Sequence, residues 1–410
     1  MRKLLPVIVL LHAAVASAQI TITDEVVSDP LRPRALPMTL AQPAVSLAKD
    51  HAGVAIAWVM GNGAADPLDR IYVARLDANG HSTGVRAIAP FGTSPTLHQG
   101  SPSLAPMPDG NGFVLAWLEL DQTVPAALPT RARPIYCLLD AALTPSVPVA
   151  LYPPLPTIAP AIARTKGDTT WISAVGQLWT VKNGAAAGPL NSIAASDMVV
   201  GTDWPQVIGG RTLTVSGLTC RCGSGFCPTS CLVPNPSRFI LDFASILTTS
   251  MTKTFDFPSE LRPAIGSNGR DVLAVWFSGA EGSGGDVVSL QLGPADFIRF
   301  NELNAHPRVL AHFDADFGDS RPDVAADGVR YIVVWRAARS LTNHDVVGVV
   351  IDNDGKLTPL TIAATPADER DPAILSLGDG TFLVAYEKGA GSERRIAGRF
   401  VRFGRVRAAR

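Results

Sequence analysis

The chain has few charged residues and no surplus of either sign. Charged side chains make up 17% of its 410 residues, and 35 Lys and Arg residues balance 36 Asp and Glu residues. Globular proteins contain about a quarter of charged residues on average. A nucleic-acid-binding protein needs a concentrated basic surface. We therefore expect no nucleic-acid partner.

Long hydrophobic runs are also lacking after the N-terminus. A basic pair, Arg2-Lys3, precedes an apolar run from Leu4 to Val15, and Ala16-Ser17-Ala18 forms a small-residue cleavage site. This pattern is typical of a secretory signal peptide over residues 1–18, and the run is too short for a transmembrane helix. We expect a secreted, soluble, monomeric chain without membrane insertion, in the periplasm or outside the cell.

The familiar catalytic motifs are missing as well. The sequence contains no Gly-x-Ser-x-Gly elbow, no phosphate-binding loop and no His-Glu-x-x-His pair, and its seven histidines show no metal-ligand spacing. We predict no cofactor and no metal. Whether the protein is an enzyme stays open, with the absence of catalysis favoured.

What the sequence does contain is a motif that recurs along its length. Each copy begins with Pro, continues through small and β-branched residues to Gly, and ends in an apolar strand closed by an aromatic residue. The clearest copies cover residues 262–276, 321–335 and 371–386. The anchoring prolines, at spacings of 45 to 59 residues, are Pro43, Pro102, Pro160, Pro205, Pro263, Pro322 and Pro372. Repetition at this period indicates a repeat architecture.

One unit is long enough for four short strands. In the sixth unit we predict strands over residues 322–326, 331–335, 345–351 and 357–363, with a polar connection over residues 336–343. Asp352-Asn353-Asp354-Gly355 has the composition of a hairpin turn, although it also resembles half of a calcium loop. The first unit has Asp77-Ala78-Asn79-Gly80 at the same place, which favours the turn. Four antiparallel strands per unit are typical of a β-propeller blade.

The two ends of the chain indicate how the ring closes. The last unit ends after its third strand, at residues 396–403, while residues 20–27 form a strand-like run that belongs to no unit. We predict that this N-terminal run supplies the missing outer strand, which gives an all-β, seven-bladed propeller in one domain over residues 19–410. The third and fourth units diverge from the pattern. Six blades, eight blades and an open solenoid remain as alternatives.

In this respect the chain resembles secreted bacterial β-propeller repeat proteins. The resemblance covers nearly the whole mature chain and implies the propeller fold without a particular activity. Two named families do not fit. Residues 164–171 keep only the Thr-Trp of the sialidase Asp-box, and the Trp-Asp signal of WD40 blades is missing.

Cysteine is scarce, and most of it is in one place. Four of the five cysteines are Cys220, Cys222, Cys227 and Cys231. In an exported chain such a cluster favours two disulfides, of unassigned pairing, that staple a loop. A tetrahedral zinc site and free thiols are the alternatives. The remaining thiol, Cys137, lies in a strand-like segment, where we expect it to be buried and inert.

The best candidates for a site precede the repeat prolines, because in a propeller these links reach the mouth of the central channel. They are Arg262, Arg321, Glu260, Asp319, Glu369 and Asp371. Arg recognises carboxylates and phosphates through its planar fork, and paired carboxylates hydrolyse glycosides. The alternative is that these groups only tie neighbouring blades together. The repeated aromatic residues Trp58, Trp117, Trp276, Trp335 and Tyr386 are expected to be core.

These observations lead to three functional hypotheses. The leading one is a non-catalytic binding protein that recognises a protein or glycan partner through the mouth and the adjoining loops. The second is a glycan-cleaving hydrolase or lyase that uses Glu260, Asp319 and Asp371 beside the two arginines. The third is a structural surface component.

Overall fold

All regular elements in the described part of the chain are β-strands. The computed structural model describes residues 20–30, 45–61, 69–92, 97–121, 132–151, 162–174, 177–191, 197–200, 207–213, 218–220, 232–234, 238–245, 248–258, 263–279, 285–293, 307–313, 322–340, 343–390 and 394–404. Within these ranges no helix has the length and apolar character needed to cross a membrane.

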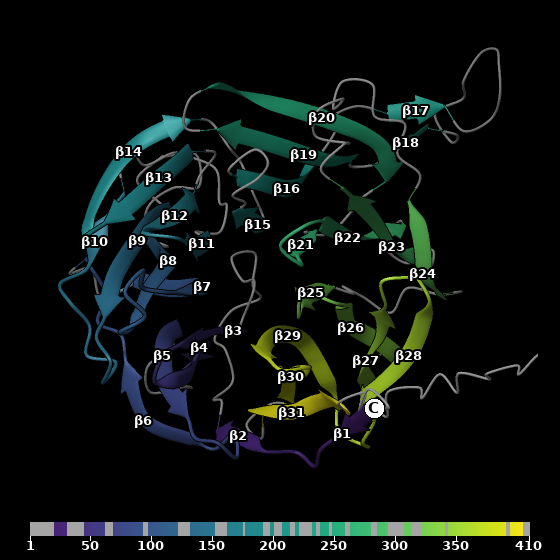
Figure 1. Cartoon of the computed structure of the whole chain (residues 1–410), viewed down its shortest axis with the longest axis horizontal. Helices are drawn as coiled ribbons and strands as arrows, with labels where there is room; N and C mark the ends of the chain where they lie inside the picture. The colour runs from purple at the N-terminus through teal and green to yellow at the C-terminus, as the bar shows by residue number, and fades with distance from the viewer. Residues whose placement is uncertain are drawn as a thin grey trace, which may run out of the picture.

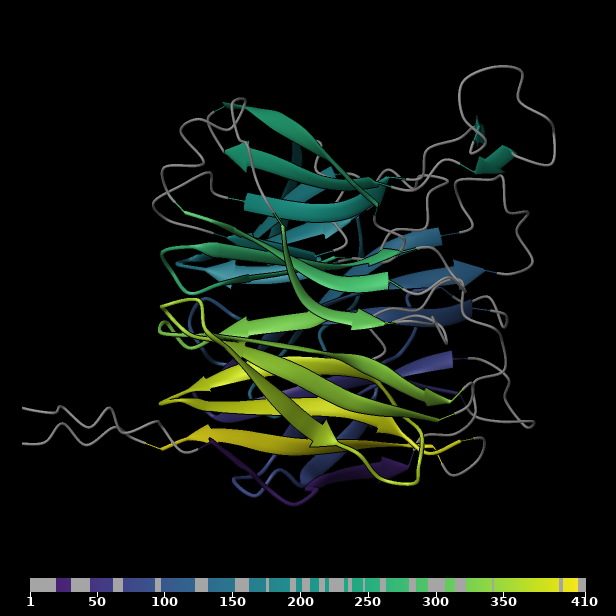
Figure 2. The same ribbon diagram turned by 90° about the vertical axis from the view of Figure 1, so that its right-hand side faces the viewer.

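All but two of the described strands form seven antiparallel sheets that stand around a central axis like the blades of a propeller (Figure 1). Viewed from the side, the sheets stack around the ring with their strands running between two faces (Figure 2). The predicted all-β propeller with seven blades is therefore confirmed. In each blade the first strand lies nearest the axis and is called the inner strand below.

The first three blades follow the chain in order. Blade one contains β3 (Val45–Asp50), β4 (Gly53–Gly61), β5 (Asp69–Leu76) and β6 (Ser82–Ala87). Blade two contains β7 (Leu97–Pro106), β8 (Phe113–Asp121), β9 (Ala132–Leu139) and β10 (Val149–Ala150). Blade three contains β11 (Ile162–Lys166), β12 (Thr169–Ala174), β13 (Gln177–Lys182) and β14 (Ala185–Asn191).

Blade four departs from the predicted repeat. It contains β15 (Asp197–Val200), β16 (Val207–Leu213), β19 (Arg238–Ser245) and β20 (Thr248–Pro258). Its inner strand β15 ends before Pro205, so this blade begins earlier than the proline pattern predicted. A separate pair, β17 (Leu218–Cys220) and β18 (Leu232–Pro234), lies outside the ring (Figure 1).

The last three blades complete the ring. Blade five contains β21 (Ala264–Ser267), β22 (Val272–Gly279), β23 (Gly285–Leu292) and β24 (Arg308–Phe313). Blade six contains β25 (Asp323–Ala326), β26 (Tyr331–Ser340), β27 (Asn343–Ile351) and β28 (Leu357–Ala363). Blade seven contains β29 (Glu369–Gly378), β30 (Thr381–Lys388) and β31 (Arg395–Phe403).

The N-terminal segment supplies the outer edge of blade seven, as predicted. It does so in two pieces: β1 (Ile20–Ile22) pairs with Val401 to Phe403, and β2 (Val27–Pro30) pairs with Arg395 to Gly398. The ring is therefore closed by hydrogen bonds between the two ends of the chain, which covers an edge strand that would otherwise be open to pairing.

Hairpin turns form where the sequence placed Asp, Asn and Gly. Between β27 and β28, Asp352 Oδ1 accepts the N–H groups of Asp354 at 3.1 Å and Lys356 at 2.7 Å, and Gly355 has a φ of 74°. The carboxylate thus satisfies its own turn, as expected of ordinary turn chemistry. The predicted polar connection over residues 336–343 was wrong for most of its length, because β26 continues to Ser340 and pairs with β27.

The repeated aromatic residues are core, as predicted, and they pack between blades. Trp58, Trp117, Trp276, Trp335 and Tyr386 are all less than 5% exposed. Trp117 of blade two lies in one cluster with Val59 and Ile71 of blade one. Trp335 of blade six lies with Leu273 of blade five. The aromatic ring of strand two therefore fills the gap to the preceding blade.

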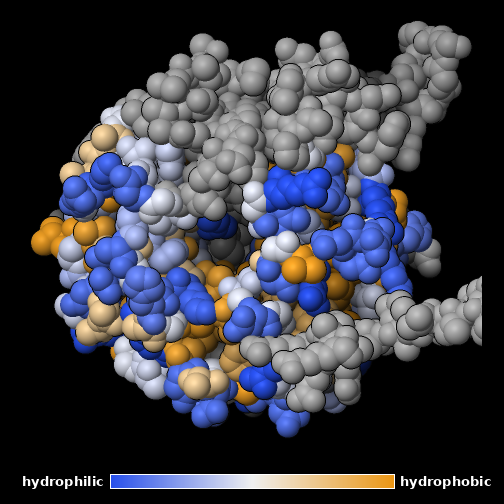
Figure 3. All heavy atoms as spheres, viewed as in Figure 1, coloured by the Kyte–Doolittle hydropathy of each residue, from blue (hydrophilic) through white to orange (hydrophobic). Residues whose placement is uncertain are grey.

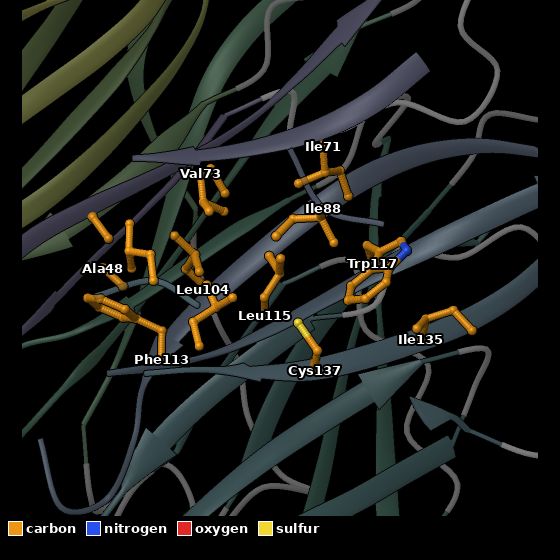
Figure 4. Close-up of a cluster of buried hydrophobic side chains, with 14 of the residues drawn as sticks. Ala48, Ile71, Val73, Ile88, Leu104, Phe113, Leu115, Trp117, Ile135 and Cys137 are labelled. Carbon is orange, nitrogen blue, oxygen red and sulfur yellow. The ribbon is translucent and has the colours of Figure 1, made fainter. Parts of the chain in front are cut away.

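The seam between blades one and two shows this packing in detail (Figure 4). Ile71, Val73 and Ile88 of blade one meet Leu115 and Trp117 of blade two, and all five are buried. Cys137 lies in the same apolar layer as a free thiol, and burial raises its pKa to about 12. The prediction of a buried thiol is therefore confirmed. Because the thiolate is the reactive form, the raised pKa agrees with the expected inertness.

The cysteine cluster falls largely outside the described residues. The backbone of Cys220 ends β17, whereas Cys222, Cys227 and Cys231 lie outside the described ranges. The two disulfides therefore stay a prediction.

Replacing the aromatic ring between blades five and six tests the packing. Trp335→Ala should lower the free energy of unfolding by about 3–5 kcal/mol, because it removes a buried ring and leaves a cavity. Urea denaturation followed by circular dichroism measures the change. Trp335→Phe is the control: Trp335 Nε1 has no hydrogen-bond partner in the described structure, so a ring of similar shape should lose far less. Equal stability of Trp335→Ala and the parent would contradict interblade packing.

Candidate functional site at the propeller mouth

The inner strands enclose a central channel of about 560 Å³. Its described wall comes from β3, β7, β11, β21, β25 and β29, and it mixes apolar residues with Ser, Thr and a few charged side chains. Figure 3 shows the hollow at the centre of the ring, with hydrophobic and hydrophilic residues on its wall. A concave space with apolar walls and a few polar groups is typical of a ligand site.

One face of the ring carries the starts of the inner strands, and we call it the mouth face. Blades two and seven each have a β-bulge at the same place, where the chain enters the inner strand. Their pairing shifts between Gly100 and Ser103 in one blade and between Arg370 and Ala373 in the other. The residue before the proline, Ser101 or Asp371, has a φ of 52° or 50°. The bulge turns Asp371 toward the channel, whose wall it joins.

The residue three positions before the proline points away from solvent instead. In blade two this is Gln99, which is 1% exposed and accepts the N–H of Ile71 of blade one at 3.0 Å. In blade seven it is Glu369, which is 0% exposed and accepts hydrogen bonds from the hydroxyl and the N–H of Thr365. In blades two and seven this repeat position thus ties the inner strand to the chain that precedes it.

Burial also changes the acidity of Glu369. Desolvation raises the pKa of this carboxyl above its usual value, although the hydrogen bonds from Thr365 and the charge of Lys388 oppose the shift. Lys388 Nζ lies 4.0 Å from Glu369 Oε1 and 2.6 Å from Glu25 Oε2. Tyr386 donates its hydroxyl to the same Glu25 oxygen at 3.2 Å. Glu25 therefore fastens the N-terminal segment to blade seven beside the mouth.

Two buried His–Asp pairs bridge blades at equivalent places on the mouth face. His344, at the start of the third strand of blade six, lies 2.7 Å from Asp368 through Nδ1 and also donates its backbone N–H to that carboxylate. Between blades one and two the order is reversed. Asp69 starts the third strand and donates its N–H to His98 Nδ1 at 3.3 Å, with the two side chains 3.5 Å apart. All four residues are buried.

Three arginines lie near the His344–Asp368 pair that bridges blades six and seven. Arg370 of β29 forms an ion pair with Asp368, and Arg394, just before β31, lies 3.6 Å from Glu387 Oε2. Arg370 is also paired across the sheet with Glu387. Burial lowers the pKa of Arg370, and the positive charges of Arg394 and Arg336 lower it further. We call Arg336, Arg370 and Arg394 the guanidinium patch.

The structure brings together only part of the predicted site. Asp371 lines the channel and Glu369 is buried behind it. Glu260, Arg262, Asp319 and Arg321 lie outside the described residues, so their placement stays a prediction. In the part of the chain that the structure describes, no group of three or more His, Cys, Asp or Glu side chains is arranged to hold a metal ion.

The guanidinium patch was missed because its members come from three different elements. Arg370 lies one position after a predicted site residue, but Arg336 comes from strand two of the preceding blade and Arg394 from the residue just before β31. A signal was present. Arg336 directly follows the repeated aromatic Trp335, and Glu387 follows Tyr386 in the same way, which marks this repeat position as polar in both blades.

Comparison with known proteins identifies no family. No family model matches the chain, and no curated protein matches it. Solved structures do resemble it. A Trypanosoma rangeli sialidase in complex with sialic acid has a TM-score of 0.50 at 8% identity, covering 93% of this chain and 58% of the sialidase. This chain thus spans less than two thirds of that protein.

Two further solved structures are similar over nearly the whole chain. A catalytically inactive virginiamycin B lyase from Staphylococcus aureus has a TM-score of 0.47 at 12% identity, covering 93% of this chain and 99% of the lyase. A sialidase from Streptococcus pneumoniae has a TM-score of 0.44 at 8% identity, covering 92% of this chain and 71% of the sialidase. At such low identity the likeness extends to the fold alone, and the chain is a β-propeller.

Glu369 provides a test of the buried repeat position. Glu369→Gln should raise the melting temperature at pH 7, because a carboxyl with a raised pKa destabilises the folded state once it is ionised, and blade two already uses Gln99 there. The direction of the pH dependence follows from the protonation state of this carboxyl. Below the ordinary Glu pKa the folded and unfolded states are both protonated, so the difference between variant and parent should vanish as the pH falls toward 4. A difference that grows on acidification would refute the argument.

The reversed His–Asp pairs provide a second test. His344→Asp alone places two carboxylates together in a buried site and should cost roughly 3 kcal/mol or more. Combining it with Asp368→His recreates the order found between blades one and two, and should restore at least half of that loss. Thermal unfolding of the parent, both single variants and the double variant measures the coupling. If the stability lost in the double variant equals the sum of the losses in the two single variants, the two seams are not equivalent.

Proposed function

We propose that this protein is a secreted, non-catalytic binding protein that recognises a protein or glycan partner through the mouth face and its adjoining loops. The carrying observation is the channel of about 560 Å³ that opens among charged residues at the starts of the inner strands. We further propose that it acts as a monomer, with neither nucleic acid nor membrane among its partners.

The hydrogen bonding of the mouth supports binding over catalysis. Glu369 lies three positions before the proline of blade seven and is fully buried. Its carboxylate contacts Thr365 and Lys388. Glu260 and Asp319 stand at the same distance before their prolines in the sequence. A repeat position that joins inner strands to the preceding chain serves the architecture. Among the described residues this leaves two carboxylates on the channel wall, Asp371 and Asp323. Asp323 accepts the N–H groups of Val324 and Ile374, both at 2.8 Å.

The second candidate is a glycan-cleaving hydrolase or lyase. One specific observation bears on it: burial raises the pKa of Glu369 above its usual value, which is the direction that a general acid at this repeat position needs. In this scheme Glu260, Asp319 and Asp371 would supply carboxylates, and Arg262 and Arg321 would hold the substrate. A structural surface component is the third possibility.

A glycan-binding screen with the purified, unreduced protein tests the proposal. We expect a ligand that is lost in the double variant Arg262→Ala, Arg321→Ala, because guanidinium groups at the mouth hold polar ligands through charge-assisted hydrogen bonds. Lys182→Ala is the matched control: its side chain is 59% exposed and pairs with Asp168 at the hairpin between β13 and β14. Binding and melting temperature are measured for each protein.

The outcomes separate the three functions. A ligand that is retained by Lys182→Ala and lost by the double variant supports a binding site at the mouth. Release of products from that ligand, abolished by Asp371→Asn without loss of folding, would instead establish the enzyme. An empty screen together with failure to capture any protein partner would leave the structural role and overturn the proposal.

A further inference from the structure

We propose that the side chains of Lys388 and Glu25 join in an isopeptide bond, with the carboxyl of Glu369 moving the protons. The bond links the N-terminal segment covalently to blade seven and so closes the ring permanently. It is a modification site within the chain itself, and it is independent of any ligand that the mouth binds.

The geometry places one amine beside two carboxyl groups in a largely buried space. Lys388 Nζ lies 2.6 Å from Glu25 Oε2 and 4.0 Å from Glu369 Oε1. The exposed fraction of the side chain is 12% for Lys388, 20% for Glu25 and 0% for Glu369. The amine therefore contacts the carboxyl that it would attack, and a second carboxyl lies within reach of its protons.

Burial favours the uncharged forms of an amine and a carboxyl. Removal from water penalises each charge, and this desolvation raises the pKa of Glu369. Transfer of a proton from the Lys388 ammonium to the Glu369 carboxylate replaces two charged groups by a neutral amine and a neutral acid. A neutral amine in a desolvated place is the nucleophile that the bond requires.

The reaction balances without any further reactant. A bond forms between Lys388 Nζ and the carboxyl carbon of Glu25, and the bond from that carbon to Oε2 breaks. The ammonium starts with three hydrogens; one stays on the amide nitrogen, and the others leave with Oε2 as water. Glu369 takes protons from the nitrogen and passes them to the departing oxygen, so it ends unchanged.

Two further side chains stabilise the reacting carboxyl of Glu25. Arg395 Nη2 lies 3.4 Å from Oε1, the oxygen that carries negative charge when the nitrogen adds to the carbon. Tyr386 donates its hydroxyl to Oε2 at 3.2 Å. Burial raises the pKa of Tyr386 above its usual value, so this hydroxyl keeps its proton near neutral pH. The departing oxygen therefore has a hydrogen-bond donor beside it.

Folding supplies the driving force for this condensation. Well-oriented groups within one molecule react as if at an effective concentration of about 10⁵–10⁸ M. The ring holds Glu25 and Lys388 in contact although they lie 363 positions apart in the sequence. The strands that fasten the N-terminal segment, β1 and β2, have only three and four residues. A covalent link across so long a loop stabilises this closure, because it restricts the unfolded chain.

Peptide mapping of the purified, reduced protein by mass spectrometry tests the bond. Trypsin cuts after free Lys and Arg, so an unmodified chain gives a peptide over residues 371–388. When Lys388 is acylated this cut fails, and we expect the peptide over residues 371–394 joined to the peptide that contains Glu25. The intact protein should weigh one water molecule less than the unmodified chain.

Two variants test the roles of the amine and of the buried carboxyl. Lys388→Arg keeps a positive charge but lacks the amine, and it should give no joined peptide. Glu369→Gln should lower the amount of joined peptide at least tenfold, because general acid–base catalysis contributes about 10²–10⁴-fold. The melting temperature of Glu369→Gln is compared in the Lys388→Arg protein, where no bond can form, so that the effect of acidity is measured separately.

Lys182 is the matched control within the same chain. Its Nζ also lies 2.6 Å from a carboxylate, that of Asp168, but the two side chains are 59% and 73% exposed. Water stabilises both charges there, so no bond should form and trypsin should cut after Lys182.

The outcomes decide the proposal. A joined peptide in the parent that is reduced in Glu369→Gln and absent in Lys388→Arg supports it. Complete cleavage of the parent after Lys388 overturns it, as do a bond from Lys388 to Glu369 in place of Glu25, an equal yield of bond at Lys182, and an undiminished yield in Glu369→Gln. None of these results depends on the glycan screen, so the bond and the proposed function stand or fail separately.

Discussion

The packing of one blade against the next is the interaction on which the whole molecule depends. A single four-stranded sheet of this protein has two apolar faces, and each face needs a neighbour to keep it from water. The repeated aromatic residue in strand two supplies much of the contact, as Trp117 does against Ile71. In a row of such sheets, every apolar face is covered only when the last blade meets the first. The pairing of β1 and β2 with β31 joins the two ends of the chain and so closes the ring.

The polar residues of the mouth follow from that constraint. Where two blades meet, the starts of their strands bring backbone groups out of water, and these groups need partners. Gln99 and Glu369 accept hydrogen bonds from the preceding chain, and the two His–Asp pairs bridge neighbouring blades. Much of the charge at the mouth is therefore architectural. The candidate site consists of what this network leaves over, which is the channel wall with Asp371.

Local sequence patterns predicted the architecture because they depend on neighbours along the chain. The hairpin at Asp352, the strand at residues 357–363 and the aromatic core position all follow from turn chemistry and alternation within one unit. The prediction was weaker where the repeat diverged. In blade four the inner strand lies ahead of Pro205, since one proline in a degenerate unit carries little positional information. The connection over residues 336–343 was also wrong, because polar residues continue a strand when a partner such as β27 is beside them.

By itself, the sequence determined the fold class, the repeat, the closure by the N-terminal segment and the burial of Cys137, since each depends on composition or on short-range periodicity. The tertiary structure decided which charged residues face the channel. A β-bulge turned Asp371 toward the axis, and burial took Glu369 out of solvent although both precede the same proline. It also brought together Arg336 of β26, Arg370 of β29 and Arg394 just before β31. Such distances along the chain carry no local signal, because only the ring brings these residues together.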